Sequence, residues 1–449
     1  MRVLIVGAGL VGSTLAGKLA RDGHDVSLVD SAAERARDLG DSLDVQVVEG
    51  NGATAAVLRR AGIERADLVV ATTDSDEVNL VVGLLASSLF QVSRLVVRLQ
   101  DDDHAEAFSL ISRGNRVDHV FVNPVQAAAD RIATLLTVPG AIDVVSFLED
   151  KLLVAGFRIG EGSDFVGLRV SDMNLLFADT PTLAVAIERR DDWIIPHGGE
   201  MIALHDLVYF AISREHLESV LDLVGIARDG REAVMIAGAT RLGLELAHRL
   251  QSNDARVVLI EPDRERARAA ADELSGVTVI HGSPTRQALL EEEDIDRVST
   301  FVSVTDDHQT NLVAGLLAKR LGAGRAIVLV DDPELVDLVG QLDIDAIISP
   351  RLLVIGLALQ HILGGRVLAA AQLLEDRVEV VEAEVEEDSE LTSGTLSEVK
   401  LPRGVLVAAL CRGDTLLVPR GSDRAEPGDR VLLITTTENE SVLARFLSR

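Results

Sequence analysis

The chain has 449 residues, too many for one hydrophobic core, and domains of roughly 100 to 200 residues predict two to four of them. Apolar residues make up 47% of the sequence, so each domain can bury a core. The 72 acidic residues exceed the 43 basic ones and give a net charge of -29, which argues against nucleic acid or an anionic lipid surface as a partner.

A single cysteine, Cys411, excludes an intrachain disulfide and is typical of a reducing cytoplasm. The longest uncharged stretch, residues 78–93, is shorter than the roughly 18 to 20 apolar residues of a membrane span. No signal-peptide pattern accompanies the first apolar run. We therefore expect a soluble, cytoplasmic protein.

An internal repeat organises the sequence. Residues 3–30 match residues 234–261, and residues 47–87 match residues 279–319 in nearly the same register. Such a match over two long segments predicts a tandem duplication, in which each copy forms the same fold.

Each copy starts with short apolar runs separated by helical periodicity. In the first copy these runs are Val3 to Val6, Val26 to Asp30, Val45 to Val48, Leu68 to Thr72, Leu95 to Leu99 and Val120 to Val122. Strands buried on both faces have continuous apolar runs of this kind. The pattern predicts an α/β fold class with two tandem Rossmann-like, doubly wound parallel sheets.

An apolar helix and a smaller β-rich segment follow each predicted sheet. The β-rich segments match each other over 184–212 and 407–435, and their alternating strands and turns predict small α+β domains. The acidic run 382–390 is interpreted as a solvated strand edge or loop. The predicted boundaries are 1–123 for the first sheet domain, 124–139 for its helix, 140–225 for the first small domain, and then 231–349, 350–366 and 367–449 for the second copy.

The sequence GAGLVG, Gly7 to Gly12, lies between the first predicted strand and a helix. Gly7 permits a tight turn, Gly9 lets the backbone approach a pyrophosphate, and Gly12 lets helix and strand pack closely. The free N–H groups at the start of the helix would face the phosphates. Asp30 ends the second strand, where it can accept ribose hydroxyls and repel a 2′-phosphate, which favours NAD(H) over NADP(H).

Other candidates follow strands three to five, because ligands bind at the carboxyl ends of parallel strands. Asn51 follows the third strand, Thr73 and Asp74 follow the fourth, and Arg98 lies at the end of the fifth. Arg98 is expected either to neutralise a phosphate or to pair with an acidic neighbour such as Asp101.

The second copy departs from this pattern at its loop. Gly238 and Gly243 persist, but Thr240 replaces the middle glycine and Glu261 replaces Asp30. Val330 falls near the place of Arg98, and Arg241 adds a cation beside the loop. An empty structural copy and an altered nucleotide site both remain open.

The sequence contains no catalytic or metal-binding motif. The ten histidines lack metal-ligand spacing, and neither a G-x-S-x-G elbow nor a P-loop is present. The segment after each sheet domain is also short for a dehydrogenase substrate domain. We assign no metal and no catalytic residue.

These motifs together resemble the TrkA family, the cytosolic NAD-binding regulators of Trk-type potassium uptake. The resemblance covers essentially the whole chain. It is carried by GAGLVG with Asp30, by TTDSDEVN at 72–79, by VNP at 122–124, and by the duplication. It implies that the sheet domains are RCK (regulator of K⁺ conductance) N-terminal domains and that the small domains are their C-terminal domains.

The resemblance also implies the nucleotide-binding residues. In the first copy they are Gly7, Ala8, Gly9, Leu10, Val11, Asp30, Thr73, Asp74 and Arg98. In the second copy they are Gly238, Ala239, Thr240, Arg241, Leu242, Glu261, Thr305 and Asp306. NAD(H) is implied for the first copy. Related rings with a GxGRxG loop bind ATP or ADP, so NAD(H) or an adenine nucleotide is implied for the second, unless that copy is empty.

The implied role is a gating ring and not an enzyme. Family members form homotetramers with eight sheet domains in a ring, docked on a transmembrane Trk subunit at the cytoplasmic face of the inner membrane. Membrane association would arise only through this partner. The alternatives are an NAD-dependent oxidoreductase, a scaffold that binds no nucleotide, and a regulator of a K⁺/H⁺ antiporter.

Overall fold

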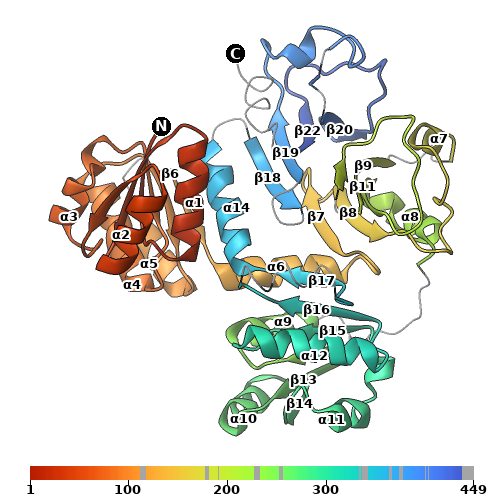
Figure 1. Ribbon diagram of the computed structural model, residues 1–449, viewed down its shortest axis with the longest axis horizontal. Helices are drawn as coiled ribbons and strands as arrows, with labels where there is room; N and C mark the ends of the chain where they lie inside the picture. Colours follow the sequence, from red (N-terminus) through yellow and green to blue (C-terminus); the bar gives the residue numbers. More distant parts are fainter. Residues whose placement is uncertain are drawn as a thin grey trace. The chain divides into compact units, whose positions relative to one another are not determined.

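Two copies of one architecture follow each other along the chain (Figure 1). The computed structural model describes residues 1–111, 118–176, 182–190, 192–226, 233–251, 256–332, 335, 342–363, 367–373, 378–399, 401–402 and 404–436. Residues 227–230 between the first small domain and the second sheet domain, residues 231–232 at the predicted start of that sheet domain, and residues 364–366 of the second predicted helix segment lie outside this range. The chain divides into two compact units, Met1–Ala128 with Ser349–Gly364, and Ala129–Ile348 with Gly365–Arg449.

The first sheet has six parallel strands in the order β3-β2-β1-β4-β5-β6. Its strands are β1 (Arg2–Val6), β2 (Asp25–Asp30), β3 (Gln46–Glu49), β4 (Leu68–Ala71), β5 (Arg94–Arg98) and β6 (Asp118–Val122). The helices between them are α1 (Leu10–Arg21), α2 (Ala33–Ser42), α3 (Ala55–Arg60), α4 (Asp76–Leu84) and α5 (Asp102–Ile111), with a 3₁₀ helix at Ile63–Arg65 and a π-helical segment at Leu85–Leu89 that continues α4. The strand order reverses between β1 and β4.

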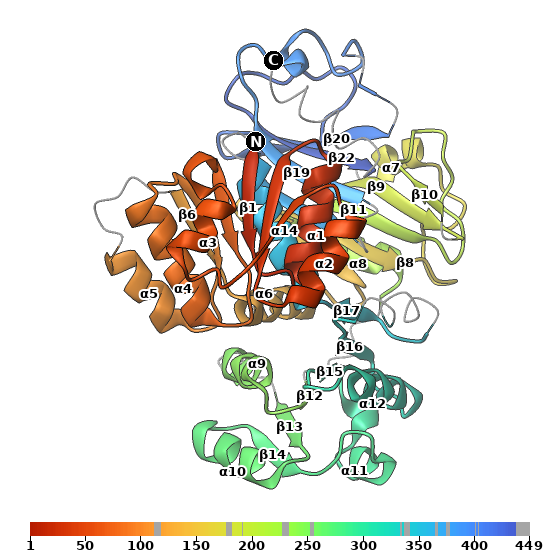
Figure 2. The same ribbon diagram turned by 60° about the vertical axis from the view of Figure 1, so that its left-hand side comes forward.

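Helices cover both faces of this sheet, as the buried apolar runs predict (Figure 2). Leu15 and Leu19 of α1 pack on one face, and Leu58 of α3 and Val82 of α4 pack on the other. Both faces of the strands are therefore removed from water, which explains why the strands are continuously apolar.

The second sheet repeats this topology in the order β14-β13-β12-β15-β16-β17. Its strands are β12 (Val234–Ala237), β13 (Val257–Glu261), β14 (Thr278–His281), β15 (Thr300–Ser303), β16 (Arg325–Leu329) and β17 (Ala346–Ile348). Its helices are α9 (Arg241–Gln251), α10 (Arg264–Glu273), α11 (Gln287–Glu292) and α12 (His308–Arg320), with a short turn at Ile295–Arg297. The predicted fold class, two tandem doubly wound parallel sheets, is confirmed.

The helix after each sheet contacts the sheet domain of the other copy. These helices are α6 (Pro124–Leu136) and α14 (Pro350–Leu363). Val354 and Ile355 of α14 lie in the same buried cluster as Val3 and Leu15 of the first sheet domain, and α14 runs beside α1 (Figures 1 and 2). The helix that follows the second sheet therefore completes the core of the first sheet domain.

Two equivalent arginines hold the carboxyl ends of these helices. Arg94, the first residue of β5, donates to the carbonyl of His361 in α14. Arg325, the first residue of β16, donates to the carbonyls of Leu135 at 2.8 Å, Val138 at 3.1 Å and Ala141 at 3.2 Å. Burial lowers the pKa of Arg325 to about 10, so its guanidinium stays charged at neutral pH beside these carbonyls.

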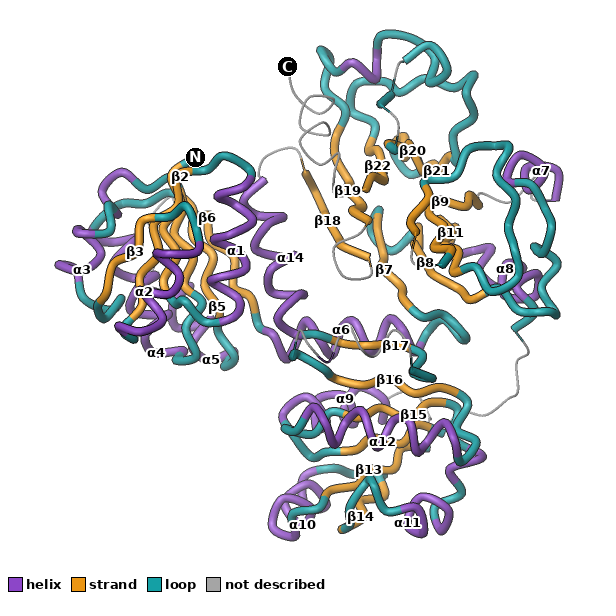
Figure 3. The backbone as a smooth tube through the Cα atoms, viewed as in Figure 1, coloured by secondary structure: helices purple, strands orange, loops and turns teal. Residues whose placement is uncertain are grey.

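The two small domains contain antiparallel sheets with matching connectivity (Figure 3). The first has the order β10-β9-β11-β8-β7 and the second β18-β19-β22-β20-β21. The first comprises β7 (Asp143–Phe147), β8 (Leu152–Arg158), α7 (Val170–Leu176), β9 (Thr182–Arg189), β10 (Asp192–Ile194), β11 (Leu207–Ser213), a turn at Arg214–His216 and α8 (Leu217–Val224). The second comprises β18 (Val367–Leu373), β19 (Val378–Glu384), a turn at Glu390–Thr392, β20 (Val405–Arg412), β21 (Thr415–Leu417) and β22 (Arg430–Thr436).

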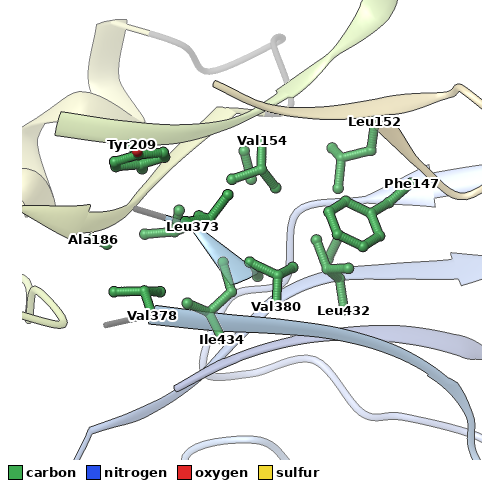
Figure 4. Packing of buried hydrophobic residues seen from close by; sticks show 14 of the residues in the cluster. Phe147, Leu152, Val154, Ala186, Tyr209, Leu373, Val378, Val380, Leu432 and Ile434 are labelled. Atoms are coloured by element: carbon green, nitrogen blue, oxygen red, sulfur yellow. The ribbon is translucent and has the colours of Figure 1, made fainter. Parts of the chain in front are cut away.

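The two small sheets bury one shared apolar cluster between them (Figure 4). Phe147 and Val154 of the first domain and Val380 and Ile434 of the second belong to it. Glu382 lies at its edge, only 2% exposed, where it accepts from the Leu148 amide at 2.8 Å and pairs with an arginine. The prediction that the whole acidic run is solvated is therefore wrong at Glu382, because this carboxylate accepts from the Leu148 amide across the interface between the small domains and pairs with Arg430 of its own domain.

Candidate functional site

A cavity of about 340 Å³ opens at the carboxyl ends of the central strands of the first sheet, where the strand order reverses. Ligands of doubly wound sheets bind at this position. The lining residues are Val6, Gly7, Gly9, Val29, Asp30, Ser31, Arg35, Gly50, Asn51, Gly52, Thr72, Thr73, Asp74, Ser75 and Val78.

The three glycines of the loop have different physical roles. Gly7 has φ +108°, donates to the Val29 carbonyl at 2.8 Å, and has no room for a Cβ, which would lie 2.8 Å from the Thr73 nitrogen. A Cβ on Gly12 would lie 1.8 Å from the Gly7 carbonyl oxygen. A Cβ on Gly9 would meet no protein atom within 4 Å. Gly7 and Gly12 are therefore required by the fold, whereas Gly9 leaves open space that a ligand can fill.

The start of α1 is open to an anion. Gly9 is its N-cap residue and provides no side-chain hydrogen bond. The amides of the first turn have no intrahelical acceptor, and the positive end of the helix dipole adds to their attraction for a phosphate. Among the predicted residues, Leu10 and Val11 belong to this turn.

Asp30 holds the loop in place. Its carboxylate accepts from the Ala8 amide at 2.7 Å and from the Ala32 amide at 2.7 Å, and its side chain is 8% exposed. A carboxylate has about four lone-pair sites, so two amides leave capacity for ribose hydroxyls. The Arg35 guanidinium lies 3.8 Å from Asp30 and lines the cavity. Sequence reasoning missed Arg35, because no motif marks this helix position.

A buried asparagine fixes the opposite wall. The Asn79 amide nitrogen donates to the carbonyls of Thr73 and Arg98, both at 2.9 Å. Its oxygen accepts from the Thr73 amide at 2.9 Å and hydroxyl at 2.7 Å. Asn79 is 0% exposed, so it joins the ends of β4 and β5 and sets the position of Thr73. The signal for this role was the identical placement of Asn79 and Asn311 in the repeat.

Arg98 contacts this wall and not Asp101. Its guanidinium donates to the Thr73 carbonyl and to the Asp74 carboxylate, each at 3.0 Å. The Asp74 side chain is 96% exposed at the cavity rim. Asn51 lines the cavity from the other side and accepts from the Ala53 amide at 2.9 Å.

The second loop has the same backbone but a different middle residue. Gly238 has φ +108°, and a Cβ on Gly243 would lie 2.0 Å from the Gly238 oxygen. The Thr240 hydroxyl donates to the Val304 carbonyl at 2.8 Å and accepts from the Gly243 amide at 3.2 Å. Thr240 therefore caps α9, whereas Arg241 is exposed as the first residue of that helix.

The acidic residue of the second copy is fully enclosed. Glu261 is 0% exposed and accepts from the amides of Ala239 at 2.7 Å and Asp263 at 2.8 Å. Arg266 lies 2.9 Å from Glu261 and 2.7 Å from Asp306. The hydrogen bond to Asp306 and the charge of Glu261 raise the pKa of Arg266 above its ordinary value.

Asn311 repeats the role of Asn79 and defines which residue replaces Arg98. Its oxygen accepts from the Thr305 amide at 2.8 Å, and its nitrogen donates to the Thr305 and Leu329 carbonyls, each at 3.0 Å. Leu329 therefore occupies the position of Arg98, one residue before the predicted Val330. Leu242 is buried under the second loop.

In the described part of the chain, no three His, Cys, Asp or Glu side chains are placed to hold a metal ion. No helix in the same residues has the length and apolar character needed to cross a membrane.

Comparison with known proteins places the chain in a family. The TrkA-N domain model matches residues 3–123 and 234–350, and the TrkA-C domain model matches residues 380–448. The Trk system potassium uptake protein TrkA of Azorhizobium caulinodans is 33% identical over 98% of this chain and 97% of its own length. The TrkA protein of Halomonas elongata is 32% identical over 96% of this chain and 95% of its own length.

Two solved structures share the fold. The crystal structure of the GsuK RCK domain has a TM-score of 0.62 at 21% identity and covers 99% of this chain and 94% of its own. The GsuK channel bound to NAD has a TM-score of 0.61 at 20% identity and covers 99% of this chain and 78% of its own. Together with the full-length relatives and both domain models, the two glycine loops and the doubled sheet topology show that the chain belongs to the TrkA family of Trk system potassium uptake proteins.

Proposed function

We propose that this protein is the cytosolic nucleotide-sensing regulatory subunit of a Trk-type potassium uptake system, and that NAD(H) binds in the cavity between Gly7 and Asp30. The observation that carries the proposal is the space above Gly9, where a Cβ meets no protein atom within 4 Å beside an uncapped helix start. A pyrophosphate fits that space and needs those amides.

Each wall of the cavity has a role in this proposal. The amides of Leu10 and Val11 would bind the pyrophosphate, and Asp30 would accept the adenosine ribose hydroxyls. Thr73 and Asp74 would line the opposite side, with Arg98 holding Asp74 in place. Arg35 would offset part of the repulsion between Asp30 and a 2′-phosphate, so we expect the preference for NAD(H) over NADP(H) to be partial and not absolute.

Regulation requires that the nucleotide bind one conformation more tightly than another. The exchanged helices α6 and α14 connect the sheet domains, so a change at the first cavity would be passed on through α14, which packs beside α1. In the proposed assembly, four chains form a ring of eight sheet domains on a transmembrane Trk subunit at the cytoplasmic face. No catalytic role is assigned.

The test uses the full chain and two variants. Gly9→Val fills the open space. Asp30→Asn removes the charge and one of the two oxygens that accept from the Ala8 and Ala32 amides, so its melting temperature is measured beside its affinity. We expect each to weaken NADH binding at least tenfold by calorimetry. The matched control is Gly160→Val, because a Cβ at this glycine also meets nothing within 4 Å but lies in the first small domain.

The same variants test regulation in vesicles that contain the transmembrane partner. We expect NADH to change K⁺ flux with the unaltered protein and with the control, and to have no effect with Gly9→Val. A full nucleotide response from Gly9→Val would show that this cavity is not the sensor.

A further inference from the structure

The Thr240 side chain occupies the part of the second loop that stays open in the first. Its hydroxyl bridges the loop to the carbonyl of Val304, directly after β15. In the first copy, the corresponding residues are Gly9 and Thr72, and both line the cavity. Thr240 therefore extends across the point where a pyrophosphate would enter, and it also takes the Gly243 amide at the helix start.

Besides Thr240, an ion pair across the second crevice also obstructs the entry of a nucleotide. Arg266 reaches from α10 to Glu261 at the end of β13 and to Asp306 after β15. The residue at the same position of the first copy, Arg35, lies 3.8 Å from Asp30, while Asp74 pairs with Arg98. The difference follows from Leu329, because the second copy has no arginine at the end of β16 to pair with Asp306.

Opening the second crevice would therefore break several contacts at once. Thr240 would lose both hydrogen bonds, and Arg266 would have to leave a carboxylate that is 0% exposed. A buried carboxylate that loses a charged partner is unfavourable, and a ribose hydroxyl replaces that charge poorly.

We infer that the second loop is closed to dinucleotides and to ADP by its own side chains, and that Thr240 and Leu329 determine this. One chain then binds one nucleotide, in the first copy. This inference rests on the proposed function, because it takes the first cavity as the open form of the same site.

The test is the number of nucleotides bound per full chain, measured with NADH and separately with ADP by native mass spectrometry and calorimetry. The unaltered protein should bind one NADH per chain. Thr240→Gly with Leu329→Arg restores the arrangement of the first copy, so this double variant should bind two. Gly9→Thr, which copies the second loop into the first, should bind none.

The outcomes separate the two proposals. Two NADH, or one NADH and one ADP at separate sites, bound by the unaltered chain would overturn this inference and leave the proposed function standing. One NADH in the double variant, with an unchanged melting temperature, would also overturn it. No binding to any of these chains would overturn both. If the double variant does not fold, the count for the unaltered chain and for Gly9→Thr still decides the matter.

Discussion

The two sheet domains share the contacts that build a crevice and differ in the residues that face it. Gly7 and Gly238 have the same φ of +108°, and Asn79 and Asn311 make the same hydrogen bonds between strand ends. The differences are Thr240 in place of Gly9 and Leu329 in place of Arg98. Each of these two loops therefore contains one set of residues needed for folding and another set whose side chains decide whether a ligand can bind.

The acidic residue belongs to both sets. Asp30 and Glu261 each accept from the amide that follows the first glycine of the loop, at 2.7 Å in both copies. An acid at the end of the second strand therefore stabilises the loop independently of any ribose. In these two copies the middle residue of the loop differs, glycine in one and threonine in the other, whereas an acid is present in both.

The largest loss of stability is expected on replacing the glycines needed for folding. Gly12→Ala and Gly243→Ala should each destabilise the protein by about 3 kcal/mol, because the new Cβ meets a carbonyl oxygen at 1.8 or 2.0 Å. Gly9→Ala should cost less than about 1 kcal/mol. Urea unfolding of the three variants checks the order. An equal loss from Gly9→Ala would show that all three glycines are needed for folding.

Replacing the buried asparagines should give the next largest loss of stability. Asn79→Leu and Asn311→Leu each leave buried backbone groups unpaired, so we expect losses of about 2 kcal/mol in both copies. Only Asn79→Leu should weaken NADH binding, since it moves Thr73 at the open cavity. Calorimetry with NADH separates the two variants, and an equal loss of affinity in both would contradict the difference between the crevices.

Arg94 and Arg325, which donate to the ends of α14 and α6, should contribute different amounts to stability. Arg325→Met removes three bonds to the carbonyls after α6, and we expect a loss of about 1.5 kcal/mol. Arg94 is less buried, so Arg94→Met should cost less. Hydrogen exchange in residues 134–142 and in α14 measures each helix end separately. A greater loss from Arg94→Met would reverse this ranking.

The smallest change in stability is expected at Thr240, where two variants separate its role as a helix cap from its role in closing the loop. Thr240→Val removes the helix cap but keeps the branched side chain, so it should destabilise by about 1 kcal/mol and leave the loop closed. Thr240→Gly should cost only a few tenths of a kcal/mol, since glycine is a tolerated N-cap. Thermal unfolding compares them. NADH binding at the second loop of Thr240→Val would show that the side chain does not block it.

The sequence was sufficient to predict the fold and the first loop, because apolar runs, glycine spacing and the repeat each depend on local chemistry. It did not reveal where side chains point across the fold. The hydroxyl of Thr240 could have faced a ligand or the protein, and only the position of the Val304 carbonyl decides between them. For the same reason, the expectation that Arg98 meets a phosphate or an acidic neighbour such as Asp101 did not identify Asp74 as that neighbour, and Glu382 was expected in solvent.

The exchanged helix α14 has a consequence for synthesis. Val3 and Leu15 are made well before Val354 and Ile355, which cover them and emerge from the ribosome after more than half of these 449 residues have followed. At translation rates of roughly 5 to 20 residues per second, this apolar face waits on the order of 10 s or longer. The first sheet domain is therefore completed only after the second sheet domain has been translated, and during that interval a chaperone would find its binding surface there.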